Sequence, residues 1–254
     1  MPGLDTIDNL DTWPLPGMEQ FLASCRSHGV KDINITGSDT DPLLFKHLPE
    51  LCSLLREEIP GAVLGLRTNG VLALARPELW GLFDKGSVSI TSFDDEIYIK
   101  TMGNGRPPDL KEILMLPGSI SKNLKINIVL CPENASPDLF ITLGKLANLG
   151  IQHVNIREPY GQPHIGNPLE LLKPEGIRLG MPFYNIFGVD VMYWDIHYVE
   201  VESVNLYANG KLSETYPVSL GHDPAVGKVE DQGHFSVSGR QFEQWTNKRK
   251  LIVL

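Results

Sequence analysis

Polar side chains recur at every second position of several short segments, and these side chains are the ones best placed to bind a ligand. In 32–36, for example, Ile33 and Ile35 alternate with polar residues. Because successive side chains of a β-strand point to opposite faces, each such segment predicts a strand with one polar face. The polar positions are Asn34, Thr36, Arg67, Asn69, Ser87, Ser89, Thr91, Lys125, Asn127, Asn155 and Arg157.

A polar face inside a fold needs hydrogen-bonding partners, because each buried polar group without one costs about 1–3 kcal/mol. A wet lumen that holds a polar ligand would supply such partners. A structural network of side chains is the alternative. The large number of polar groups favours the ligand, and we expect a small polar molecule as the binding partner.

The elements that position these residues are strands alternating with helices. Helical spacing of apolar residues, together with helix-ending glycines and prolines, predicts helices at 15–28, 43–58, 94–102, 109–116 and 138–149. Such an alternation favours a parallel sheet with helices outside it, either a (β/α) barrel or a doubly wound sheet. Strands of a doubly wound sheet are covered on both faces and are usually apolar throughout. One polar face therefore favours the barrel.

The fold class is thus predicted to be α/β, with residues 1–182 forming a partial (β/α) barrel of parallel strands with outer helices. After residue 158, prolines and glycines break up any long helix. The chain then becomes rich in β-formers, and Asn209-Gly210 is typical of a type I′ hairpin turn. We expect 183–254 to be a small antiparallel β extension packed on the barrel.

Four motifs resemble those of radical S-adenosylmethionine (SAM) enzymes. The turn at 34–44, Asn-Ile-Thr-Gly-Ser-Asp-Thr-Asp-Pro-Leu-Leu, resembles the family's Gly-Gly-Glu-Pro turn. Arg-Thr-Asn-Gly at 67–70 resembles the end of its third strand, and Ser-Val-Ser-Ile-Thr-Ser-Phe-Asp at 87–94 resembles its fourth. Residues 96–103 are similar to the molybdenum-cofactor GTP-cyclase branch. The resemblance covers roughly residues 15–165, in the family's order.

This resemblance implies SAM as a cofactor. In the family, the backbone of the Gly-Gly-Glu-Pro turn binds the amino group of the methionine moiety, and hydroxyls of the fourth strand meet the carboxylate and ribose. Asp39 and Asp41 would stand in for the glutamate of the turn. The implied cofactor-binding residues are Thr36, Gly37, Ser38, Asp39, Asp41, Asn69, Ser89, Thr91, Asn127 and Arg157.

The cysteines depart from the family pattern. Radical SAM chemistry needs a [4Fe–4S] cluster held by three closely spaced thiolates, usually Cys-x-x-x-Cys-x-x-Cys. Cys25, Cys52 and Cys131 have neither that spacing nor that position, and we predict that they are packing residues. The first strand and its cysteine loop would lie upstream of Met1, in an N-terminally shortened form or a cluster-free descendant. This chain alone is not expected to perform the radical reaction.

Two further groups are candidates for catalysis and metal binding. The loop 160–164 follows a predicted strand, so Arg157 and His164 would lie at the C-terminal mouth of the barrel, where His164 could act as an acid or base. An ordinary loop histidine is the alternative. Asp195 and His197 share a predicted strand face and are candidate metal ligands, although a solvated edge strand accounts for them too.

Composition narrows the class of partner. The net charge is −9, and the only basic run is the tail 247–250, so nucleic acid is not expected. No apolar run reaches the roughly 20 residues of a membrane span, and 1–15 lacks the features of a secretory signal. Three widely spaced cysteines favour a reducing compartment, and we expect a cytoplasmic location. A homo-oligomer or a partner enzyme is compatible with the sequence.

Three functional hypotheses stay open. The first is a radical SAM family protein that binds SAM and a small polar substrate in its lumen. The second is a cluster-free ligand-binding or partner protein derived from such a barrel. The third is a non-redox (β/α) barrel enzyme that uses Arg157, Glu158 and His164. Whether the chain is an enzyme is thus undecided at this point.

Overall fold

The computed structural model describes residues 9–37, 40–103, 105–158, 165–194, 202–215 and 252–253. Within them the chain is a mixed α/β protein with one sheet, whose strand order is β10-β9-β11-β1-β2-β3-β4-β5-β8-β7-β6. Strands β9, β11, β1 to β5 and β8 pair in parallel, and the remaining pairings are antiparallel. The sheet is therefore mostly parallel, as the alternation of strands and helices predicts.

The middle of the sheet follows the order of the sequence. Its strands are β1 (Asp32–Thr36), β2 (Val63–Thr68), β3 (Lys85–Ile90), β4 (Leu124–Val129) and β5 (His153–Arg157). Each pairs in parallel with the next, so every connection must cross back along the sheet. The alternating pattern predicts strands at 32–36, 63–68, 87–91, 124–130 and 151–157, and the five observed strands confirm these bounds to within two residues at each end.

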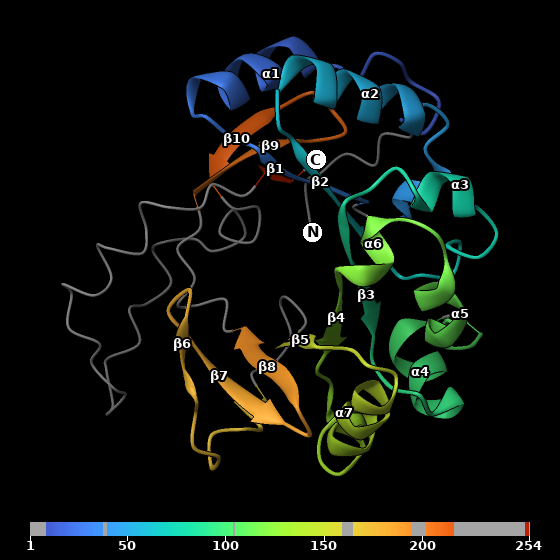
Figure 1. The fold of residues 1–254 in the computed structure, drawn as a ribbon, viewed down its shortest axis with the longest axis vertical. Coiled ribbons are helices and arrows are strands. Elements are labelled where there is room, and N and C mark those ends of the chain that lie inside the picture. Colours follow the sequence, from blue (N-terminus) through green and yellow to red (C-terminus); the bar gives the residue numbers. More distant parts are fainter. Residues whose placement is uncertain are drawn as a thin grey trace.

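Helices cover one face of this parallel core. Figure 1 shows them along the outer side of the curved sheet, with α1 and α2 beside β1 and β2 and α7 near β4 and β5. The apolar residues of the strands, such as Leu64, Val88 and Ile126, are fully buried on this side. The helices are α1 (Met18–Ser27), η1 (Pro42–Leu44), α2 (Leu48–Glu58), α3 (Pro77–Trp80), α4 (Asp95–Met102), α5 (Leu110–Met115), α6 (Ser119–Lys122), η2 (Pro132–Asn134) and α7 (Asp138–Asn148).

The C-terminal strands extend the sheet at both ends. At one end β8 (Val189–Trp194) pairs in parallel with β5, and β7 (Met181–Ile186) and β6 (Gly176–Arg178) follow in antiparallel order. At the other end β11 pairs with β1, and β9 pairs with β11. The bounds there are β9 (Glu202–Leu206), β10 (Leu212–Thr215) and β11 (Ile252–Val253). The antiparallel strands thus divide between the two ends.

Two finer predictions concern closure of the barrel and the type of the hairpin turn. The strand order runs from β10 to β6 without a pairing between these two edges in the described residues, so closure into a barrel is not shown. The hairpin between β9 and β10 is present, but only Gly210 in its loop has a positive φ, of 79°. A type I′ turn needs two such residues, so this prediction is wrong; the loop fits a type I turn followed by a left-handed glycine.

None of the helices in the described residues combines the length and apolar character needed to cross a bilayer.

Candidate functional site

The polar residues of the central strands share the face turned away from the helices. Strand register places Thr36, Arg67, Ser87 and Lys125 in one row across β1 to β4. A second row joins Ser89, Asn127 and Asn155 across β3 to β5. Residues in register on neighbouring strands point to the same face. The alternation in the sequence therefore produces a continuous polar surface, which we call the polar face.

Four cationic side chains lie on this face, one on each of four neighbouring strands. They are Arg67 on β2, Lys85 on β3, Lys125 on β4 and Arg157 on β5. Burial, together with the nearby charges of Arg67, Lys85 and Arg157, lowers the pKa of Lys125 to about 8, while Asp32 acts in the opposite direction. The four cations are therefore close enough to interact.

Asp32 and its neighbours balance part of this charge. The carboxylate of Asp32 forms an ion pair with Lys85 and accepts a hydrogen bond from Nδ2 of Asn34, at 3.3 Å. The side chains of Arg67 and Lys125 form no hydrogen bond or ion pair within the described part of the chain. Their charges are thus not neutralised by a direct contact with these residues.

Sequence reasoning recognised Lys125 and Arg67 as polar-face residues but did not assign them to the site. The available signal was that each is a long cation inside an otherwise neutral, alternating strand. A cation at such a position must reach solvent or a counter-ion, because an unpaired buried charge is costly. This signal favours Arg67 and Lys125 as ligand contacts over the residues of the turns and loops.

The turn after β1 is predicted to bind SAM. Its described residues mainly stabilise the turn itself and its contact with β2. A Cβ on Gly37 would lie 1.8 Å from the carbonyl oxygen of Thr40, so only glycine fits there. Asp41 is buried; it accepts hydrogen bonds from the backbone N–H of Leu43, at 2.9 Å, and from the hydroxyl of Thr68. Asp41 therefore caps η1 and fastens it to β2.

Two other predicted ligands also serve the fold. Oδ1 of Asn69 accepts the backbone N–H of Val71, at 3.0 Å, in a tight turn after β2. Thr91 is fully buried, and its hydroxyl lies 2.6 Å from that of Thr101 on α4. These contacts use the polar groups of Asn69 and Thr91 to hold the loops that follow β2 and β3.

The structure thus places the predicted cofactor-binding residues in two different settings. Thr36, Ser89, Asn127 and Arg157 lie on the polar face, whereas Gly37, Asp41, Asn69 and Thr91 lie in turns and loop contacts. The remaining predicted site residues fall outside the described residues. They are Ser38, Asp39, His164, Asp195 and His197.

Glu158, a candidate for acid–base chemistry, also has structural partners. Its Oε1 accepts hydrogen bonds from the backbone N–H groups of Ile165 and Gly166, at 3.0 and 2.8 Å. It accepts a third from the hydroxyl of Tyr193 on β8, at 2.8 Å. Glu158 therefore joins the backbone at residues 165–166 to β8.

The cysteines do not fit an iron–sulfur cluster. Cys25 on α1 and Cys52 on α2 are buried among apolar side chains, and burial raises the pKa of both thiols to about 12. Burial and the neighbouring Glu133 also raise the pKa of Cys131. Cluster ligation requires thiolates that converge on one point. In the described residues no three His, Cys, Asp or Glu side chains are grouped to hold a metal ion.

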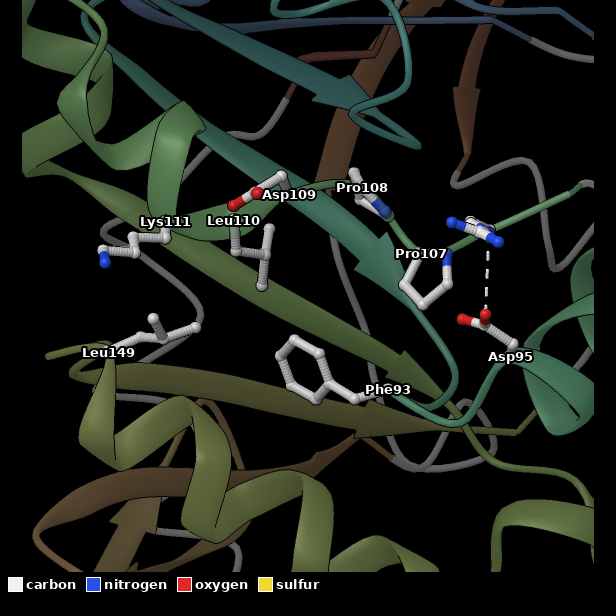
Figure 2. Close-up of a pocket in the computed structure, with 9 residues that line it drawn as sticks. Phe93, Asp95, Pro107, Pro108, Asp109, Leu110, Lys111 and Leu149 are labelled. Carbon is white, nitrogen blue, oxygen red and sulfur yellow. Dashed lines mark ion pairs between the residues drawn. The ribbon is translucent and has the colours of Figure 1, made fainter.

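A separate pocket of about 330 Å³ opens among the helices. Figure 2 shows Phe93, Pro107, Leu110 and Leu149 lining it, with Asp95 at its edge. The Nε of Arg106 lies 3.6 Å from Oδ2 of Asp95, and both side chains are largely exposed. The pocket lies in the loop and helix layer, and none of its lining residues belongs to the polar face.

The chain matches no protein-family model and no curated protein. The radical SAM resemblance is therefore carried by the sequence motifs described above.

Proposed function

We propose that this chain binds a small ligand through its anionic group on the polar face of its parallel sheet, without a cluster held by its own cysteines. The sequence motifs point to SAM, whose carboxylate would meet the cations although the molecule also carries a positive sulfonium and ammonium. The observation that carries the proposal is the group formed by Arg67, Lys85, Lys125 and Arg157 on four adjacent strands.

The cations supply the affinity. Like charges held together on one face repel one another, and an anion bound among them removes that repulsion. The guanidinium of Arg67 offers a planar pair of donors that matches a carboxylate or a phosphate. The whole protein carries a net charge of −9, so the polar face is a locally positive region in a protein that is negative overall.

Neutral polar groups beside the cations suit the rest of such a ligand. Ser89, Asn127 and Asn155 lie in the row next to Lys125, towards the C-terminal ends of the strands. Hydroxyl and amide groups both donate and accept hydrogen bonds, so they suit sugar hydroxyls or a base edge. This combination supports a nucleoside or amino-acid derivative that bears a carboxylate or phosphate.

Titration calorimetry on the full chain tests the proposal, with SAM and inorganic pyrophosphate as separate probes. We expect one-site binding of at least one probe, and Arg67→Gln should weaken it by about tenfold or more, since a charge-assisted hydrogen bond contributes about 1.5–3 kcal/mol. Arg106→Gln is the matched control, because Arg106 is 85% exposed in the helix layer. Absence of binding, or equal weakening by both substitutions, would overturn the proposal.

S-adenosylhomocysteine tests whether the sulfonium of SAM contributes to binding. It keeps the carboxylate and the nucleoside but lacks the positive sulfonium. Because the polar face is cationic, we expect it to bind at least as tightly as SAM. A site that prefers SAM strongly over S-adenosylhomocysteine must present negative charge to the sulfonium, and that result would contradict an anion site built on these cations.

A further inference from the structure

Lys125 has an unusual setting among the cations of the polar face. It lies in register with Ser87, which in turn lies in register with Arg67. Strands are about 4.8 Å apart, so Arg67 and Lys125 start about 10 Å from each other, with β3 between them. Lys85 precedes Ser87 by two residues on the same face of β3. Lys125 is thus surrounded by cations and only partly exposed.

We propose that Lys125 is a nucleophile that forms an imine with an aldehyde or ketone whose carboxylate or phosphate is held by Arg67 and the neighbouring cations. The inference rests on the proposed function, because the anion must first bind on the polar face. The inference narrows the class of ligand to carbonyl compounds with an anionic group. It also adds a covalent step to the proposed binding.

The free amine of Lys125 is unusually abundant. Only the neutral amine has a lone pair that can attack a carbonyl, and an ordinary lysine is almost fully protonated near neutrality. Burial and adjacent cations lower the pKa of Lys125 from 10.5 to about 8. At pH 7.5 the neutral fraction rises by about 200-fold over that of an ordinary lysine. Desolvation and a neighbouring cation are the established means of activating a lysine.

Lys85 is not an equivalent nucleophile, although it lies on the same face. Its ammonium is engaged with the carboxylate of Asp32. Lys125 has no acidic partner within hydrogen-bonding distance in the described residues, and only the more distant charge of Asp32 favours its ammonium there. The arrangement therefore separates two roles: Lys85 contributes charge, and Lys125 contributes the reactive nitrogen.

The proposed step balances without a redox partner. The amine nitrogen of Lys125 attacks the carbonyl carbon and forms a C–N bond, and the carbonyl oxygen takes up a proton. The resulting hydroxyl leaves as water while the C=N bond forms. One amine, one carbonyl and one proton yield one protonated imine and one water. Lys125 is partly exposed, so solvent water supplies and takes up the protons.

The test uses pyridoxal 5′-phosphate, an aldehyde with a phosphate, followed by borohydride reduction and peptide mapping of the full chain. We expect Lys125 to be the main modified residue and its labelling rate to rise with a midpoint near pH 8. Pyridoxal, which lacks the phosphate, should label Lys125 at least about tenfold more slowly. Labelling of Lys125 no faster than that of the exposed Lys31 and Lys111 would overturn the proposal.

Variants and a binding measurement separate this inference from the proposed function. Lys125→Arg should abolish the main adduct, and Lys111→Arg should leave it unchanged. Peptide mapping of the labelled wild-type protein does not require that either variant folds. Pyrophosphate binding that depends on Arg67, without a trapped adduct at Lys125, would refute the imine and leave the anion site standing. Rapid labelling of Lys125 by pyridoxal and its phosphate alike would refute anion-directed chemistry.

Discussion

The side chain of Asn34 on β1 lies over Gly65 on β2, in the space that a larger residue at position 65 would fill. A Cβ at Gly65 would stand 2.3 Å from Oδ1 of Asn34 and 3.2 Å from Cε of Lys85. This close approach lets Asn34 and Lys85 converge on Asp32. A larger residue at position 65 would therefore have to displace the Asn34 side chain.

Gly65→Ala is expected to displace Asn34 and loosen the contacts around Asp32. The loss of a hydrogen bond contributes about 1 kcal/mol, so the free energy of unfolding in urea should fall by about that amount. Binding of the anionic probe should weaken as well. Gly105→Ala is the control, since nothing lies within 4 Å of a Cβ there. An unchanged Gly65→Ala protein would contradict the close approach.

Asp41 is expected to behave as a residue of the fold. Asp41→Ala removes the cap of η1 and leaves the Thr68 hydroxyl and the Leu43 N–H without their acceptor. We expect a loss of about 2–3 kcal/mol in the free energy of unfolding. Asp109→Ala, which removes the exposed cap of α5, should cost only about 1 kcal/mol. Equal losses for the two variants would argue against a buried anchoring role.

The pH dependence of stability should report on Lys125. In the unfolded chain its pKa returns to about 10.4, whereas in the folded protein it is about 8. Between these values the unfolded state binds more protons, so this residue makes the free energy of unfolding rise with pH. Below pH 8 both states are protonated and the gain is absent.

Lys125→Met isolates that contribution. The difference in unfolding free energy between wild type and Lys125→Met should move by about 2 kcal/mol in favour of wild type between pH 7 and pH 10. Urea denaturation at several pH values measures it. Parallel curves for the two proteins would show that the pKa of Lys125 is not depressed.

Cys25 and Cys52 should remain unreactive while the chain is folded. Since burial raises the pKa of Cys25 and Cys52 to about 12, their thiols are protonated at pH 7.5 and should react with a disulfide reagent only after unfolding in guanidinium. Anaerobic incubation of this chain with iron and sulfide should produce no cluster absorbance. A stable brown protein that loses its colour in Cys25→Ser would refute this assignment.

The sequence alone determined the strands, their polar side and most of the helices, because alternation and helical spacing are local properties of the chain. Asn127 and Ser89 could be placed on the polar face for that reason. It also identified Gly37 as part of a constrained turn. The type I′ turn predicted at Asn209-Gly210 is wrong, since a loop with one left-handed residue accommodates the same dipeptide.

Only the tertiary structure decided which polar groups are already used. Asp41, Asn69 and Thr91 look like ligand contacts in the sequence, but their partners Thr68, Val71 and Thr101 come from the packing of loops and helices. The same holds for the cations. Arg67, Lys85, Lys125 and Arg157 lie far apart in the chain, and strand register brings them onto one face. Register depends on the burial of the opposite, apolar face, which is a property of the whole fold.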